Sequence, residues 1–331
     1  MKNVNPADPL HVRTLATCLL GVMALSPFLF VGCGKETEGN FGHDDEERTK
    51  LIVVATTTHV ADMVRSVAGD RIELLALMGP RVDPHLYKPS ARDAAALAKA
   101  DLVFYSGLML EGRMADLFAK AARSGVQAYA VTEKVPQERL LEPEEFEGHW
   151  DPHVWFDPSI WASCIEVVRE GLVAHDPQEA EFYQTNAESL RAEYLAIHDW
   201  AKSRLTAIPE EDRKLITSHD AFNYFGRAFD FEVIAVQGIS TATEAGLADR
   251  AAMVDYVKSH EVKAIFVESS VNPAIIQEIA SEAGVKVGGE LFSDAMGESG
   301  QTKGPDGEVY DVSTWTGMMK HNLNVIVEGL K

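Results

Sequence analysis

The sequence has little cysteine. Its 331 residues include 3 cysteines, and two of these, Cys18 and Cys33, belong to an N-terminal apolar segment and its boundary. Cys164 is left without a disulfide partner, and its place in an apolar pattern of helical spacing predicts a small core residue. A disulfide framework and cysteine chemistry are therefore excluded, so the fold depends on its hydrophobic core.

Basic residues are scarce as well. Lysine and arginine number 30 against 51 aspartates and glutamates, which gives a formal net charge of −21. Such a surface repels phosphates and excludes nucleic acid as a partner, whereas it is compatible with a protein that meets cations. Because 46% of the residues are hydrophobic, the chain is able to bury one large core or two ordinary ones.

Familiar catalytic motifs are missing too. The sequence contains no H-E-x-x-H, no G-x-S-x-G, no glycine-rich phosphate loop and no second cluster of metal-ligand residues. A metallohydrolase would need an open coordination position for water and a nearby general base. These absences favour a protein that is not an enzyme.

The N-terminus has the pattern of a bacterial lipoprotein signal. Lys2 and Arg13 precede an apolar run over residues 14–31, which ends at Gly32 and Cys33 and is followed by a polar segment. This pattern predicts a signal peptide over residues 1–32, lipidation of Cys33 and a flexible tether over 33–50. The protein is then extracytoplasmic and lipid-anchored, in a periplasm or on a cell surface; the alternative is a plain transmembrane anchor.

Strand-like and helix-like segments alternate through the rest of the chain, which predicts α/β architecture with mostly parallel central sheets. We expect a first α/β domain over residues 51–177 and a second over 209–331. Residues 178–208 contain a stretch without glycine or proline and with apolar residues at helical spacing. This stretch predicts one long, rigid α-helix of roughly 40 Å between the domains.

Four metal-ligand residues stand out by their positions. His85 and His153 each end an Asp-Pro-His tripeptide, His219 directly follows a predicted strand and starts the next helix, and Asp294 follows another strand. The carboxyl ends of strands are where open α/β sheets bind ligands. Two donors from each half would form one site in the interdomain cleft, and three imidazoles with one carboxylate suit zinc or manganese.

Three further residues are candidates for a supporting role. His59 ends the first predicted strand, Glu268 ends a later one, and His149 precedes the second Asp-Pro-His tripeptide. Each would act by orienting a ligand or by contacting the metal briefly. Each also has an ordinary structural explanation as a loop or strand-end residue.

The sequence resembles the metal-specific substrate-binding lipoproteins of bacterial ABC importers, the zinc- and manganese-binding group known as cluster A-I. The matching segments, in family order, are GPRVDPHLYKPSARDAAALAKADLVFYSGLMLEG, HWDPHVWFDPSIW, TSHDAFNYFGRAF, VQGISTATEAG, AIFVESSVNP, ELFSDAMG and TWTGMMKHN. The resemblance implies metal ligands at His85, His153, His219 and Asp294. It also implies two domains bridged by one long helix.

The resemblance further implies the task. The protein would be a monomer that captures one divalent transition-metal ion and delivers it to an ABC permease and its ATPase. Some family members carry glutamate at the position of His219, and dedicated zinc members often carry a long histidine-rich loop that is short here. Zinc and manganese therefore rank equally as cargo, and iron ranks third. A surface adhesin or a metal chaperone remains the alternative on the same fold.

Overall fold

The computed structural model describes residues 50–305 and 307–331. The predicted signal peptide, the lipidation site at Cys33 and the tether up to residue 49 lie outside the described residues. In the part of the chain that is described, no helix combines the length and the apolar character needed to cross a membrane.

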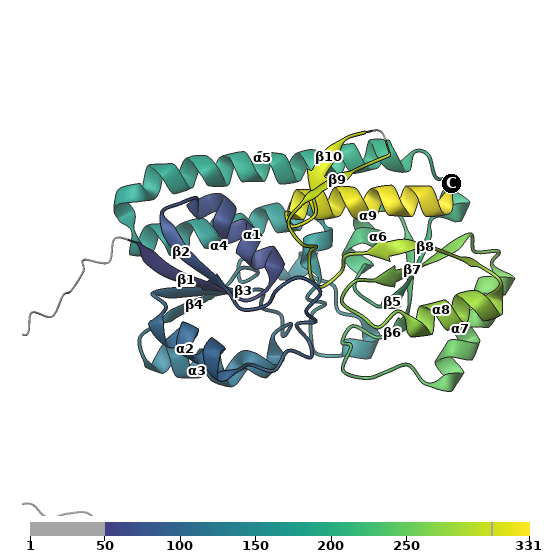
Figure 1. Ribbon diagram of the computed structural model, residues 1–331, viewed down its shortest axis with the longest axis horizontal. Coiled ribbons are helices and arrows are strands. Elements are labelled where there is room, and N and C mark those ends of the chain that lie inside the picture. The colour runs from purple at the N-terminus through teal and green to yellow at the C-terminus, as the bar shows by residue number, and fades with distance from the viewer. Residues whose placement is uncertain (1–49, 306) are drawn as a thin grey trace, which may run out of the picture. The chain divides into compact units, whose positions relative to one another are not determined.

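The first half of the described chain, residues 51–177, contains a four-stranded parallel sheet in the order β2-β1-β3-β4 (Figure 1). Its elements are β1 (Leu51–Ala55), α1 (Thr58–Ala68), β2 (Ile72–Ala76), α2 (Ala91–Lys99), β3 (Leu102–Tyr105), α3 (Ala115–Arg123), β4 (Gln127–Ala130) and α4 (Pro158–His175). Helix α2 begins directly after Ser90, because Ser90 and Asp93 form a reciprocal capping box. The expected α/β architecture is confirmed.

The second half, residues 209–331, is also α/β. Its parallel strands form two hydrogen-bonded pairs, β5 with β6 and β7 with β8, and β5 lies next to β7. Its elements are β5 (Lys214–His219), α6 (Asn223–Phe229), β6 (Glu232–Gln237), α7 (Leu247–Ser259), β7 (Ala264–Glu268), α8 (Ala274–Ala283), β8 (Lys286–Leu291), β9 (Gln301–Lys303), β10 (Val309–Asp311) and α9 (Trp315–Leu330). The antiparallel β9–β10 pair was not anticipated from the sequence.

A single helix, α5 (Ala180–Leu205), follows the first half (Figure 1). Its buried residues recur every three or four positions, as the sequence pattern requires. This face packs against α1 and α4 of the first half and against α9 of the second. The long helix predicted between the halves is therefore present, within two to three residues of the expected ends.

The largest apolar cluster draws on both halves. It includes Trp155 and Trp161 from the first half, Tyr194 from α5 and Trp315 from α9, all with at most 1% of their surface exposed. Two smaller clusters are confined to one half each. Because close-packed side chains resist displacement, the shared cluster holds the loops at the junction in fixed positions.

Candidate metal-binding site

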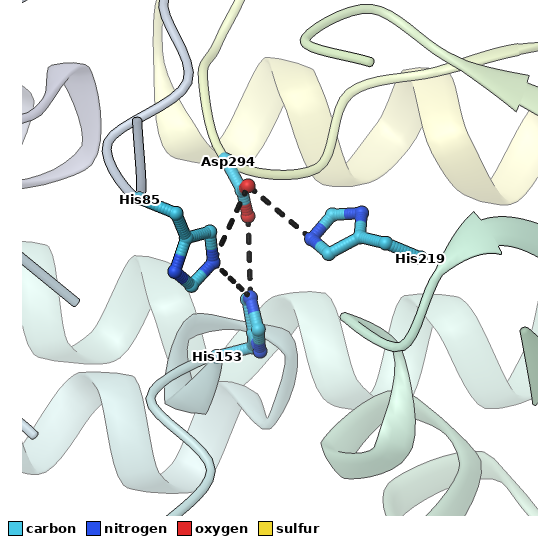
Figure 2. A group of neighbouring side chains, drawn as sticks. All are labelled: His85, His153, His219 and Asp294. Carbon is cyan, nitrogen blue, oxygen red and sulfur yellow. Dashed lines mark hydrogen bonds and ion pairs between the residues drawn. The ribbon is translucent and has the colours of Figure 1, made fainter. Parts of the chain in front are cut away.

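The structure brings the four predicted ligand residues together. His85, His153, His219 and Asp294 each offer one ligand atom, and these atoms all lie within 4.8 Å of one another (Figure 2). His85 comes from the β2–α2 loop, His153 directly precedes a short 3₁₀ helix (Val154–Phe156), and Asp294 follows β8. The side chain of His85 is 5% exposed and those of the other three are fully buried.

His219 departs from the prediction in one respect. It was expected to follow its strand and begin the next helix, whereas it is the last residue of β5, and α6 starts at Asn223. Its backbone pairs with Gln237 of β6, so pairing between the two strands fixes the position of His219 directly. The imidazole therefore projects from the sheet edge itself, where parallel strands present their carboxyl ends.

The spacing within the group is that of ligands around one ion. The Nε2 atoms of His219, His153 and His85 lie 3.2, 3.3 and 3.7 Å from the Asp294 carboxylate oxygens. The Nε2 atoms of His85 and His153 are 3.4 Å apart. A tetrahedral ion with ligands at about 2.0–2.1 Å gives ligand–ligand separations of roughly 3.3 Å. The donor set and its size thus fit a single transition-metal ion.

Carboxylates on the far side of two rings fix which nitrogen faces the group. The Nδ1 atom of His153 lies 2.8 Å from Oδ1 of Asp151, and that of His219 lies 2.6 Å from Oε2 of Glu268. A carboxylate on Nδ1 holds the proton there and leaves Nε2 as the metal-facing lone pair. Glu268 also accepts the backbone N–H of His219 at 2.8 Å, so this predicted supporting residue contacts one of the four clustered residues directly.

Burial and neighbouring charges shift the pKa values of the clustered residues in opposite directions. Burial lowers the pKa of His85 to about 3 although Asp294 opposes this effect. Burial also disfavours the charged form of His153, but Asp151 and Asp294 outweigh it and raise the pKa to about 9. For Asp294, burial is outweighed by the surrounding imidazoles, which hold the pKa of its carboxyl well below the usual range. At neutral pH the group therefore combines an ionised Asp294 with a neutral His85 and a protonated His153.

Each Asp-Pro-His tripeptide forms the same local turn. Oδ1 of Asp83 accepts the backbone N–H of His85 at 2.8 Å, and Oδ1 of Asp151 accepts that of His153 at 2.9 Å. Aspartate favours this turn because its short carboxylate reaches the N–H two residues on, and the intervening proline fixes φ. In each tripeptide, the aspartate thus orients the backbone of the histidine and thereby its imidazole.

Residues that sequence reasoning missed hold the Asp294 loop. In α9, Asn322 accepts the backbone N–H of Phe292 at 2.9 Å and donates to its carbonyl at 2.7 Å. The indole N–H of Trp155 donates to the carbonyl of Ser293 at 3.1 Å. Both side chains are buried, so they fix the backbone on the N-terminal side of Asp294. Both residues lie in segments that resemble the family, HWDPHVWFDPSIW and TWTGMMKHN, but only their long-range contacts reveal this role.

Two candidate histidines do not join the group. His59 is fully buried and stacks on Trp155 with ring centroids 4.6 Å apart, and burial lowers its pKa to about 3. Among the described residues its ring nitrogens have no hydrogen-bond partner. His149 is exposed, and its ring contacts Phe146. Neither is a member of the four-residue cluster.

Comparison with known proteins adds independent evidence. The sequence profile of the family described as "Zinc-uptake complex component A periplasmic" matches residues 53–329. The manganese-binding lipoprotein MntA of Bacillus subtilis is 37% identical over 318 residues, which cover 95% of this chain and 99% of the relative. The zinc-binding protein TroA of Treponema pallidum is 37% identical over 286 residues, or 85% of this chain and 89% of the relative.

Two further matches extend this pattern. The iron ABC transporter substrate-binding lipoprotein MtsA of Streptococcus pyogenes serotype M1 is 30% identical over 311 residues, covering 92% of this chain and 96% of the relative. The solved structure of periplasmic TroA superposes with a TM-score of 0.79 at 36% identity, covering 85% of this chain and 99% of that one. The family profile spans both halves and all four clustered residues, so the chain belongs to the zinc-uptake complex component A family.

Proposed function

We propose that this protein captures one divalent transition-metal ion with His85, His153, His219 and Asp294 and delivers it to an ABC importer. The convergence of three Nε2 atoms and one carboxylate within 4.8 Å is the observation that carries this proposal. The relatives support it, because they are named as metal-binding proteins and as ABC transporter substrate-binding lipoproteins. The partners are a permease and its ATPase, and the protein acts as a monomer.

The two halves form the two lobes of this binding protein in our proposal. The lobes are residues 51–177 and 209–331, joined by the helix over 178–208, and each supplies two ligands. The continuous α5 helix restricts wide hinge motion, so release occurs through small tilts or loop rearrangement. The lipid on Cys33 anchors the protein on the extracytoplasmic side of the membrane.

The cargo is zinc or manganese, and iron ranks third. Relatives are named for each of these metals, and three imidazoles with a carboxylate accept all of them. The protein has a transport role and is not an enzyme. The four protein ligands complete a tetrahedral coordination and leave no position for water. Such a closed site suits capture and release of the ion better than activation of water.

Calorimetric titration of the metal-free protein with zinc and with manganese tests this function. We expect one site per chain, and zinc should bind more tightly in vitro whichever metal is transported. His153→Ala should lower the affinity sharply, whereas the matched control His149→Ala should leave it unchanged. Equal affinity for the two variants would overturn the ligand assignment, and turnover of hydrolysable esters would contradict the transport role.

A further inference from the structure

The aspartates of the two Asp-Pro-His tripeptides share a second feature: each forms a hydrogen bond to a residue in the other half of the protein. Each uses one oxygen for its own histidine turn and offers the other oxygen to a polar side chain of the second half. Oδ2 of Asp83 accepts the hydroxyl of Thr241 at 2.6 Å, and Oδ2 of Asp151 accepts the amide N–H of Asn223 at 3.2 Å. Both ligand turns of the first half are therefore tied to the second half through a carboxylate.

The Thr241 contact is the stronger of the two links. It is short, its acceptor is a carboxylate, and Thr241 is buried with 7% of its surface exposed; hydrogen bonds to charged acceptors of this kind are roughly twice as strong as neutral ones. The same loop makes a second crossing between Arg81 and Glu290 at 2.7 Å, but those side chains are 55% and 39% exposed. Solvent screens such an exposed pair, so Thr241 dominates the connection.

We propose that Thr241 and Asn223 are positioning residues that hold His85 and His153 in their metal-binding geometry only while the two halves are together. A tilt that separates the halves pulls on the carboxylates, and each carboxylate pulls on the backbone N–H that orients its imidazole. Opening of the protein and loss of ligand geometry then become one event. This inference rests on the proposed function, since it assigns the means by which the same site releases its metal.

His85 depends more on the Thr241–Asp83 contact than His153 does on the Asn223–Asp151 contact. The ring of His153 is held a second time, because Asp151 also contacts its Nδ1 atom at 2.8 Å. In the described chain no carboxylate holds Nδ1 of His85 in this way. A cavity of about 330 Å³ borders Asp83, Leu86 and Thr241, which leaves room for the His85 turn to shift. The loss of Thr241 should therefore release metal more readily than the loss of Asn223.

Release of zinc from the full protein to an excess of chelator, followed by stopped flow, tests the proposal. Thr241→Val keeps the shape of the side chain and removes the hydroxyl, and we expect it to speed release by about tenfold, the range available to a charge-assisted hydrogen bond. Thr243→Val is the matched control, since Thr243 is exposed on the same loop and should release zinc at the wild-type rate. Asn223→Ala should speed release by about threefold.

A second measurement separates positioning from general stability. A double-mutant cycle makes this separation: Thr241→Val should have no further effect on release when Asp83 is already alanine, because the hydroxyl acts on His85 through that carboxylate. Equal release rates for the two threonine variants, or an undiminished effect of Thr241→Val when Asp83 is already alanine, would overturn the inference. Wild-type protein that binds no zinc or manganese would instead overturn the proposed function itself.

Discussion

The two Asp-Pro-His turns have the same sequence and the same backbone hydrogen bond, yet they present their imidazoles in different surroundings. His153 is fully buried and its Nδ1 atom contacts Asp151, the aspartate of its own tripeptide. His85 belongs to a loop whose aspartate, Asp83, contacts Thr241 instead of the ring. A short motif thus determines a turn, whereas the environment into which the loop folds determines what the ring does.

Removal of the ligands themselves should give the largest difference between the turns. A bound metal contributes roughly 10–16 kcal/mol shared among four ligands, so loss of one ligand costs about two orders of magnitude in affinity. We expect His153→Ala to lose at least this much. His85→Ala should lose less, because the His85 side chain is 5% exposed whereas the other three are fully buried, so water is able to take its place as a ligand. Titration calorimetry measures both, and a greater loss in His85→Ala would reverse the ranking.

Substitution of the aspartates should give a smaller, but still unequal, effect. Asp151→Asn weakens the contact that fixes the His153 ring, and loss of such a partner lowers metal affinity by roughly 10-fold to 100-fold. Asp83→Asn keeps an oxygen for the backbone N–H of His85 but replaces the charge-assisted bond from Thr241 with a weaker neutral one, so it should cost less than about tenfold. The same titrations serve, with circular dichroism as the control for folding. Equal losses would show that the two aspartates have the same function.

The pH dependence of stability should distinguish the two turns, because His153 binds a proton in the folded protein and His85 does not. The pKa of His153 is raised from 6.5 to about 9, so the metal-free folded protein holds a proton there that the unfolded chain releases. The stability that this group confers is complete below pH 6.5 and is lost as the pH rises through about 9. Because metal displaces the proton, affinity should increase with pH over the same window.

Asp151→Asn should reduce this pH dependence, since it removes the nearest charge that raises the pKa of His153. Asp83→Asn should leave it unchanged, because His85 is already neutral throughout this range with a pKa of about 3. Thermal unfolding of the metal-free variants between pH 6 and 9 provides the measurement. A slope as steep in Asp151→Asn as in the wild-type protein would attribute the titration to another group.

The smallest effect should come from the exposed ion pair on the His85 loop. Arg81→Gln removes a pair with Glu290 whose side chains are more than one-third exposed, and such pairs contribute little. We expect metal affinity to change by less than about threefold, and the difference should shrink further at high salt. A tenfold loss on titration would mean that this pair, rather than Thr241, controls the loop.

Much of the fold was accessible from the sequence because its elements are long and regular. Helix α5 has no glycine or proline and a consistent apolar face, and its observed span, Ala180–Leu205, lies within the predicted one. The β9–β10 pair escaped prediction because strands of three residues carry no periodicity. The division into two short strand pairs also has no sequence signal, since hydrogen-bonded pairing is decided by packing.

The four clustered residues were predictable because each follows a motif or a strand whose position the fold constrains. Their supporting contacts were less so. Asp151 was visible as part of its tripeptide, and Glu268 as a strand end, but Asn322 lies 28 positions after Asp294 on a helix with ordinary apolar spacing. Its contact with Phe292 depends on how α9 packs beside β8. Such long-range polar contacts are a property of the assembled structure.

The hydrogen bonds between Asn322 and Phe292, just before Asp294, have a consequence for proteolysis. A protease that cut the chain between β10 and α9 would leave His85, His153, His219 and Asp294 intact in sequence. If the α9 fragment then dissociated, the two backbone hydrogen bonds that fix Phe292 would be lost, and the carboxylate would lose its fixed place among the imidazoles. Cleavage followed by loss of α9 would therefore inactivate the protein without touching any of the four clustered residues.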